Sequence, residues 1–451
     1  MKETTSPAAR LAAAALFLAA TAPEAIAANA SSLAVTSGVA LEARYEYLDG
    51  GFRNGAPDED EILVNRVELS AGRAWQTDRG TFKAQFELWD ARAFLHDDDT
   101  PLDTGEVNAL EPVNAWVAWS SEFGEVRAGR LTEDLGSRRL IARNIYRNTT
   151  NTFTGIDWRG DLGPWRAQAF IYSPDRRLPA RRERVDDDDF KYDEASLERL
   201  LYGLYAQRQA TERDKLELYA YHLDENDTDD APSRNRRITT PGARWVRSAP
   251  EGGLDAELEI ALQFGKVRAS PEATDISDLD HRAALVHGEI GWRPSATGPR
   301  TSVEVAWASG DDDPADNDNG TFDSLAGVIV GDYGPSGIWT AVTRNNMFTA
   351  TARIDGRPLP GVHAHALVRH IRLPSEADAW FGARLRDPTG NAGDEVGTQF
   401  ETRVRWWAIP EQVRLEGGWV HFARGDFATD APGVPRGDTV DYFWFATRII
   451  F

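Results

Sequence analysis

The segment 131–152 is basic in a chain that is otherwise strongly acidic, with a formal net charge of -22. It carries four arginines, Arg138, Arg139, Arg143 and Arg147. Only two acidic residues, Glu133 and Asp134, balance them within the segment. Guanidinium groups bind carboxylates through paired hydrogen bonds, so such a cluster inside a pore would bind and pass anions. Alternatively, the arginines pair with neighbouring carboxylates and brace the segment, and both roles are compatible with the sequence.

Runs of aspartate at 97–99, 186–189, 227–230 and 311–318 form the opposite kind of cluster. Calcium takes about six to eight oxygen ligands, which such runs could supply. The last run lacks the spacing and the closing glutamate of an EF-hand. We favour solvated loops, or loops that divalent ions bridge to neighbouring phosphate groups. The candidates for a loop-bound Ca²⁺ are Asp311, Asp313, Asp316 and Asp318.

The motifs of common enzyme families are missing from the sequence. There is no Gly-x-Ser-x-Gly, no His-Glu-x-x-His and no Walker-type glycine loop. The absence of cysteine excludes disulfides, thiolate metal sites and a cysteine nucleophile. His363 and His365 lie two residues apart, but no third metal ligand accompanies them. We therefore expect no enzyme and no cofactor other than loop calcium. Since Asp and Glu outnumber Lys and Arg by 72 to 50, nucleic acid is also excluded as a partner.

The elements that position these residues show an alternation of apolar and polar side chains. Between 253 and 264, the apolar residues are Leu254, Ala256, Leu258, Ile260, Leu262 and Phe264. The residues between them are mostly acidic or amide-bearing. A period of two predicts a strand with one apolar and one polar face, and helical spacing is not seen.

About eighteen segments follow this pattern. They lie at 38–48, 61–76, 80–92, 111–121, 124–133, 152–161, 164–173, 199–211, 213–224, 236–248, 253–267, 279–293, 299–310, 340–355, 360–373, 395–408, 411–424 and 439–451. Their connections alternate between short turns, such as 77–80, and long loops, such as 311–339. This layout predicts a transmembrane antiparallel β-barrel, with short periplasmic turns and long extracellular loops. An open sheet would leave backbone groups unsatisfied in lipid, so the barrel must be closed.

Aromatic residues support a barrel that lies in a membrane. Five tryptophans fall where strands approach short turns, as expected for an interfacial girdle: Trp75, Trp158, Trp245, Trp292 and Trp406. The last strand ends at Phe451, which resembles the signal that the outer-membrane assembly machinery recognises. At the other end, Lys2 and Arg10 precede an apolar run and small residues. Residues 1–27 therefore read as a signal peptide cleaved near 27–30, and 31–451 as a single barrel domain.

Six runs of the sequence together form one pattern of residues. They are 126–131, 135–141, 147–149 and 153–156, with upstream support at 86–92 and 114–117. In these runs the sequence resembles the alginate export family of outer-membrane porins. It implies a monomeric barrel of eighteen strands, whose arginine-lined constriction passes an anionic uronate polysaccharide. The matching positions are Arg66, Arg127, Arg130, Arg138, Arg139 and Asp157. Strand phase adds further candidates for the lumen, namely Arg44, Arg159, Arg353, Arg369, Arg403, Arg405 and Arg414.

Lumenal acids dilute this positive field, so three hypotheses stay open. The first is a Gram-negative outer-membrane pore for anionic saccharides, with lipid, lipopolysaccharide and the solute as its partners. The second is a general or cation-preferring porin. The third is a structural or adhesive surface barrel, whose acidic loops bind divalent ions.

Overall fold

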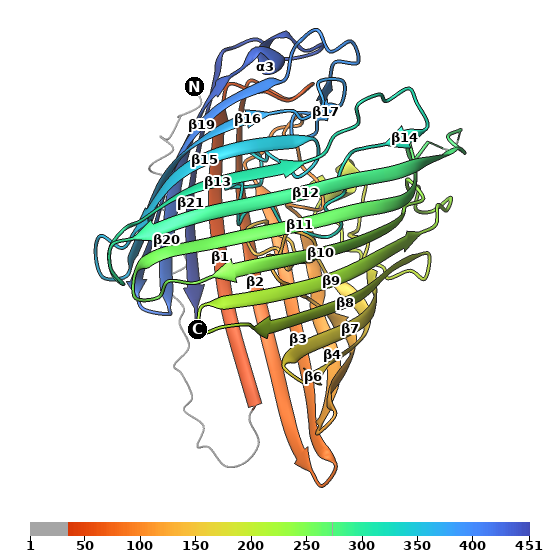
Figure 1. Ribbon diagram of the computed structural model, residues 1–451, viewed down its shortest axis with the longest axis vertical. Coiled ribbons are helices and arrows are strands. Elements are labelled where there is room, and N and C mark those ends of the chain that lie inside the picture. Colours follow the sequence, from red (N-terminus) through yellow and green to blue (C-terminus); the bar gives the residue numbers. More distant parts are fainter. Residues whose placement is uncertain (1–34, 273) are drawn as a thin grey trace.

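A computed structural model describes residues 35–272 and 274–451 of the chain. They form one closed antiparallel barrel of eighteen strands, which confirms the predicted fold class (Figure 1). The predicted signal peptide at 1–27 lies outside the described residues. No helix within the described residues is long and apolar enough to cross a membrane.

The barrel strands are β1 (Val35–Asp49), β2 (Glu59–Thr77), β3 (Gly80–Phe94), β4 (Asn108–Ser121), β5 (Gly124–Leu131), β6 (Phe153–Leu162), β7 (Trp165–Pro174), β8 (Arg199–Gln209), β9 (Asp214–Glu225), β10 (Arg237–Arg247), β11 (Gly253–Arg268), β12 (Asp278–Arg293), β13 (Arg300–Ala308), β15 (Met347–Gly356), β16 (Val362–Arg372), β19 (Glu395–Ile409), β20 (Val413–Arg424) and β21 (Thr439–Ile450). Short elements in the loops are β14 (Asp318–Asn319), β17 (Ala379–Trp380), β18 (Leu385–Arg386), α2 (Arg182–Asp186) and α3 (Asp426–Asp430).

The first and last strands close the ring. β1 pairs with β21 from Ala40 opposite Ile450 to Asp49 opposite Asp441. Every other barrel strand pairs with its neighbours along the chain, so no barrel edge is left open within the described residues. Starting from β1, β10 is nine pairings away in one direction. It is also nine away in the other direction, so β10 lies opposite β1 across the lumen.

The connections alternate as the sequence predicts. Long loops at one end span 50–58, 95–107, 132–152, 175–198, 226–236, 269–277, 309–346, 373–394 and 425–438. Short turns at the other end span 78–79, 122–123, 163–164, 210–213, 248–252, 294–299, 357–361 and 410–412. The start of β1 and the end of β21 both lie at the short-turn end.

The two faces of each strand differ as the alternation requires. On β11, Leu258, Ile260 and Leu262 are exposed on the outside, whereas Glu259 and Gln263 are buried on the inside. Outward apolar side chains provide the surface that faces lipid. Some tryptophans near the short turns donate hydrogen bonds to turn residues: Trp119 Nε1 to the Arg79 carbonyl at 3.1 Å, and Trp158 Nε1 to the Phe123 carbonyl at 3.0 Å.

The interior contains more than the polar lining that the sequence predicts. Near the long-loop end, the loops fold inward and pack into an apolar core around Phe52, Trp339, Trp380, Phe422 and Tyr442. Phe52 stacks on Trp380 with ring centroids 5.4 Å apart. This core explains the one large error among the predicted strand boundaries. The strand predicted from residue 340 begins at Met347, since residues 340–346 belong to the inward loop, where Ala341 and Val342 are buried.

Replacing Ile260 by arginine tests the outward face of β11. The charge would lie in the hydrocarbon layer, so we expect the free energy of unfolding to fall by about 2–4 kcal/mol. Urea titration of the barrel in phospholipid vesicles measures this. As the control, Thr297→Arg in an exposed turn should change it by less than about 0.5 kcal/mol. Equal effects of the two substitutions would contradict the assignment of the faces.

Candidate functional site

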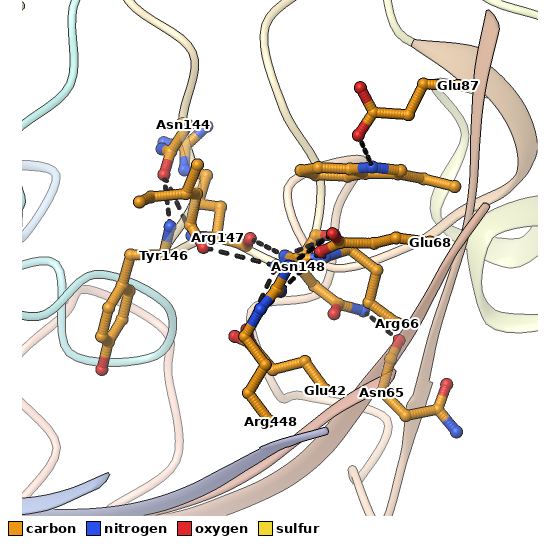
Figure 2. Close-up of polar contacts among 12 residues, drawn as sticks. Glu42, Asn65, Arg66, Glu68, Glu87, Asn144, Tyr146, Arg147, Asn148 and Arg448 are labelled. Atoms are coloured by element: carbon orange, nitrogen blue, oxygen red, sulfur yellow. Dashed lines mark hydrogen bonds and ion pairs between the residues drawn. The ribbon is translucent and has the colours of Figure 1, made fainter. Parts of the chain in front are cut away.

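The β5–β6 loop, residues 132–152, enters the lumen and is held there by Arg66 of β2. The Arg66 guanidinium pairs with Glu68 at 2.7 Å and with Glu42 at 3.3 Å. It also donates to the carbonyls of Arg147 at 2.7 Å and Asn148 at 3.3 Å, as Figure 2 shows. A buried guanidinium thus links two wall carboxylates to the backbone of the loop.

Asn148 fixes the same part of the loop from its own side. Its side-chain amide donates to the carbonyls of Asn65 at 2.9 Å, Arg92 at 3.0 Å and Glu106 at 2.7 Å. These carbonyls belong to β2, to β3 and to the β3–β4 loop. One buried amide therefore joins three separate pieces of backbone, and these carbonyls satisfy its own donors.

Next to this contact, Arg44 of β1 anchors Tyr146. Its guanidinium pairs with Glu46 at 2.7 Å, donates to the Tyr146 carbonyl and lies 4.3 Å from the centre of the tyrosine ring. Two arginines predicted from strand phase and family resemblance, Arg44 and Arg66, thus face the lumen. Both are almost fully buried beneath the loop, so they position it rather than contact passing solute.

At its other end, the loop reaches the opposite wall. Arg139 pairs with Glu257 at 2.5 Å and Glu259 at 2.6 Å on β11, and with Asp332 of the β13–β15 loop at 2.8 Å. β11 is nine strand pairings from β2, so the loop crosses the whole lumen. The charges of Arg139 and Arg344 hold the pKa of Asp332 far below its ordinary value despite its burial.

The β13–β15 loop, residues 309–346, lies against the first loop. Residues 141 and 326 form a β-bridge between them, and the Ala142 N–H donates to the Ala326 carbonyl at 3.1 Å. Arg369 of β16 holds this second loop by donating to the carbonyls of Tyr333 and Asp332. The two loops together cross the lumen, and we refer to them as the constriction loops.

The remaining arginines of segment 131–152 do not form a ring of free cations. Arg143 pairs with Glu87 at 2.5 Å and Arg138 with Asp134 at 2.9 Å. Arg147 contributes its backbone, since its carbonyl accepts from Arg66 and its N–H donates to Asn144. The bracing role that the sequence left open is the one seen in this geometry.

A further group joins β5, β6 and the start of the loop. Arg127 contacts Asp157 at 2.9 Å and Glu133 at 2.6 Å, while Arg159 contacts Asp157 at 3.1 Å. The Tyr172 hydroxyl donates to Asp157 at 2.8 Å. Both predicted wall arginines here and Asp157 are therefore brought together, again as mutually neutralising partners.

Arg130 belongs to a different cluster, since the alternation of β5 places it on the face opposite to Arg127. It pairs with Glu111 and, at 3.2 Å, with Asp175, and it donates to the carbonyl of Asp193 at 2.6 Å. Burial raises the pKa of Asp193 to about 6. Arg130 thus ties β5 to the β7–β8 loop and is not part of the constriction.

The wall formed by β19, β20, β21, β1 and β2 carries a basic stripe. We define it as five arginines, Arg66, Arg403, Arg405, Arg414 and Arg448, with the three glutamates Glu42, Glu68 and Glu416. Glu416 contacts Arg403, Arg405 at 2.7 Å and Arg414 at 4.0 Å. Arg448 pairs with Glu68 at 2.6 Å and Glu42 at 3.0 Å. Five positive and three negative charges leave the stripe with a net charge of +2.

The opposite wall is acidic. We define the acidic wall as six carboxylates on β9 and β11–β13, namely Glu217, Asp255, Glu257, Glu259, Glu289 and Glu304. Their cationic partners are Lys215, Arg244, Arg300 and the loop residue Arg139. Six negative and four positive charges leave a net charge of -2. As defined, the basic stripe and the acidic wall therefore carry net charges of opposite sign on opposite sides of the lumen.

Sequence comparison agrees with this architecture. The profile of the alginate export family matches residues 34–440, most of the described barrel. The chain belongs to the alginate export family. No curated protein sequence matches it. The family and the porin-like fold are those of an outer-membrane channel rather than an enzyme.

Solved structures of outer-membrane porins share the fold of this alginate export family barrel. OccAB1 of Acinetobacter baumannii has 11% identity and a TM-score of 0.63, with 92% of this chain and 96% of that chain covered. OccAB3 of the same organism has 11% identity and a TM-score of 0.60, covering 92% and 99%. OccD3 (OpdP) of Pseudomonas aeruginosa has 12% identity and a TM-score of 0.57, covering 94% and 93%.

Two further predictions concern Arg353 as a lumenal residue and the loop aspartates as calcium ligands. Arg353 pairs with Asp355 at 2.8 Å and contacts His365 at 3.1 Å, so it does line the wall. The side chains of Asp311, Asp313, Asp316 and Asp318 do not form a cluster close enough to hold a metal ion. The one group of potential metal ligands within the described residues lies elsewhere. Calcium binding by the loops stays a prediction.

Sequence reasoning missed Arg448 and Asn148. Arg448 could have been found by phase, because it lies between outward residues of the final strand. Asn148 lies in the run 147–149 that carries the family resemblance, but its anchoring role was not predicted, since its three acceptors come from distant backbone segments.

Removing the Asn148 amide tests the anchoring of the loop in this barrel. Asn148→Ala removes three buried hydrogen bonds between the loop and the wall, so we expect the free energy of unfolding to fall by about 1–3 kcal/mol. Single-channel recordings should also show larger current fluctuations as the loop loosens. Asn391→Ala is the matched control, because that amide bonds only within its own exposed turn. Quiet, unchanged currents in the Asn148 variant would contradict the anchoring role.

Glu106, in the β3–β4 loop, should make the stability of the barrel depend on pH. Burial, with a contribution from Asp103, raises its pKa from 4.5 to about 8. The folded barrel therefore holds a proton that the unfolded chain releases, so stability is present at low pH and is lost as pH rises toward 8. We expect a loss on the order of 3 kcal/mol between about pH 5 and pH 8.

Glu106→Gln stays neutral at every pH and should remove this part of the loss, as urea titrations at the two pH values would show. Glu251→Gln in an exposed turn is the control. An unchanged pH dependence in the Glu106 variant would refute the assignment.

Proposed function

We propose that this barrel is a monomeric pore of the Gram-negative outer membrane for anionic saccharides, with a uronate polymer such as alginate as the candidate solute. The basic stripe is the observation that carries the proposal. Four of its arginines keep 18–37% of their side chains exposed: Arg403, Arg405, Arg414 and Arg448. Membership of the alginate export family supports the choice of solute.

The arrangement of charge explains how a neutralised lumen can still favour anions. The acidic wall repels a carboxylate, while the basic stripe attracts it, so a polyanion is held along one side of the lumen. Each stripe arginine already shares a glutamate, and a passing uronate competes for the same guanidinium. Because the glutamate competes with the uronate for each guanidinium, the solute binds weakly enough to move on, as conduction through a pore requires.

Passage also involves the two loops that cross the lumen. The β5–β6 and β13–β15 loops join opposite walls through Arg66 and Arg139, so they narrow the route. We infer that a polymer slides between the loops and the basic stripe, because that side carries the exposed arginines.

A cation-preferring porin is the second candidate, since the acidic wall and the net charge of -22 would favour cations. The two candidates predict reversal potentials of opposite sign under a salt gradient.

Ion selectivity in planar bilayers tests the proposal. We expect the wild-type pore to prefer anions, and Arg405→Gln with Arg414→Gln to lower the anion-to-cation permeability ratio by at least about twofold. Uronate oligomers should block the double variant less than the wild type. The matched control is Arg282→Gln, an arginine that is largely exposed on β12.

Cation preference in the wild type would contradict the proposal and support the second candidate. A complete absence of conductance would favour a structural or adhesive barrel.

A further inference from the structure

Three glutamates face one another across neighbouring strands of the acidic wall. Glu257 of β11 is directly opposite Glu289 of β12, which is directly opposite Glu304 of β13. Like charges in such cross-strand pairs repel. Glu257 is compensated by Arg139 and Arg244, and Glu289 by Arg300 at 2.6 Å. Within the described residues, Glu304 pairs with no lysine or arginine, and its closest possible partner is His287.

His287 lies two residues before Glu289 on β12, on the same inward face, and is 1% exposed. Neither of its ring nitrogens has a hydrogen-bond partner among the residues that the structure describes, and the same is true of Oε1 of Glu304. His287 Nε2 is 3.9 Å from Glu304 Oε1, and Nδ1 is 3.7 Å from Glu257 Oε1. Buried polar groups are rarely left without a partner, so a ligand that satisfies them is expected here.

The geometry points to a divalent metal site: we propose that His287, Glu289 and Glu304 bind a zinc-like transition-metal ion. One ligand atom from each residue lies within 4.8 Å of the others. Ligands around Zn²⁺ stand about 2.0–2.2 Å from the ion, so small side-chain rotations bring the three atoms into its coordination shell. The ion neutralises Glu304, which has no lysine or arginine partner within the described residues, shares Glu289 with Arg300, and gives the imidazole its missing partner.

The donor set selects the class of metal. An imidazole nitrogen with carboxylate oxygens suits zinc and similar transition ions, whereas calcium and magnesium prefer oxygen ligands alone. Two arginines lie near the site. Arg300 contacts the ligand Glu289 at 2.6 Å but also pairs with Asp255, and Arg139 is already neutralised by Glu257, Glu259 and Asp332. Three protein ligands leave a coordination position open for water or a solute group.

The position of the site indicates how the metal reaches it and what it touches. Glu289 lines a cavity of about 790 Å³ near the short turns of β12–β13 and β15–β16. Asp332 of the β13–β15 loop has Oδ1 4.0 Å from His287 Nε2. The metal therefore lies where the barrel wall meets one of the two constriction loops. This inference does not depend on which solute the pore passes.

Calorimetric titration of the purified barrel with Zn²⁺ tests the site. The protein is first treated with a chelator, and excess Ca²⁺ is present to occupy carboxylate-only loop sites. We expect one high-affinity ion per barrel, with the Kd raised at least about tenfold by His287→Ala and by Glu304→Gln. The control is His281→Ala, a buried histidine on the same strand whose nitrogens contact Asn319 and Gln263.

Heat-modified mobility in gels verifies that each variant is folded, and the near-isosteric Glu304→Gln keeps the test valid if His287→Ala does not fold. X-ray absorption of the zinc-loaded barrel should show imidazole scattering that is absent from His287→Ala. The proposal is overturned if the wild type binds no Zn²⁺, or if binding and the imidazole signal survive in both variants.

Discussion

A chain that crosses lipid must satisfy every backbone hydrogen bond within itself, and the pairing of β1 with β21 makes this possible here. Closure leaves the outside of the barrel largely apolar and directs most charged side chains of the strands into the lumen. A chain with 72 acidic and 50 basic residues therefore concentrates charge in a narrow space. The interior is organised around the need to pair these charges.

Pairing explains why the arginines of this family member act mainly as structural groups at the constriction. Arg66, Arg139 and Arg369 hold two loops across the lumen, each through carboxylates or carbonyls of those loops. Buried ion pairs of this kind position groups without adding much net stability. In the pore that we propose, selectivity then depends on the small surplus of charge in the basic stripe and in the acidic wall.

The alternation of apolar and polar residues predicts the strands, because every second residue of a strand contacts lipid and must be apolar. Both ends of the other predicted strands lie within three residues of the observed bounds, and the exception, near 340, falls where a loop packs apolar residues inside the barrel. The phase of a strand also predicts which arginines face inward, such as Arg44 and Arg405. It does not predict their partners, because Glu257 and Arg139 are 118 residues apart and meet only when the loop folds inward. The sequence does not predict the cluster of His287, Glu289 and Glu304 for the same reason, since it forms only when β12 and β13 pair in register.

The central claim is that one face of each strand contacts lipid and the other does not. Because the chain lacks cysteine, single cysteines can be introduced and spin-labelled at successive positions from 254 to 264 on β11. In phospholipid vesicles, the account predicts that accessibility to oxygen dissolved in lipid peaks at every second position, including 258, 260 and 262. Uniform accessibility to a water-soluble relaxing agent, or a period of three to four residues, would contradict it.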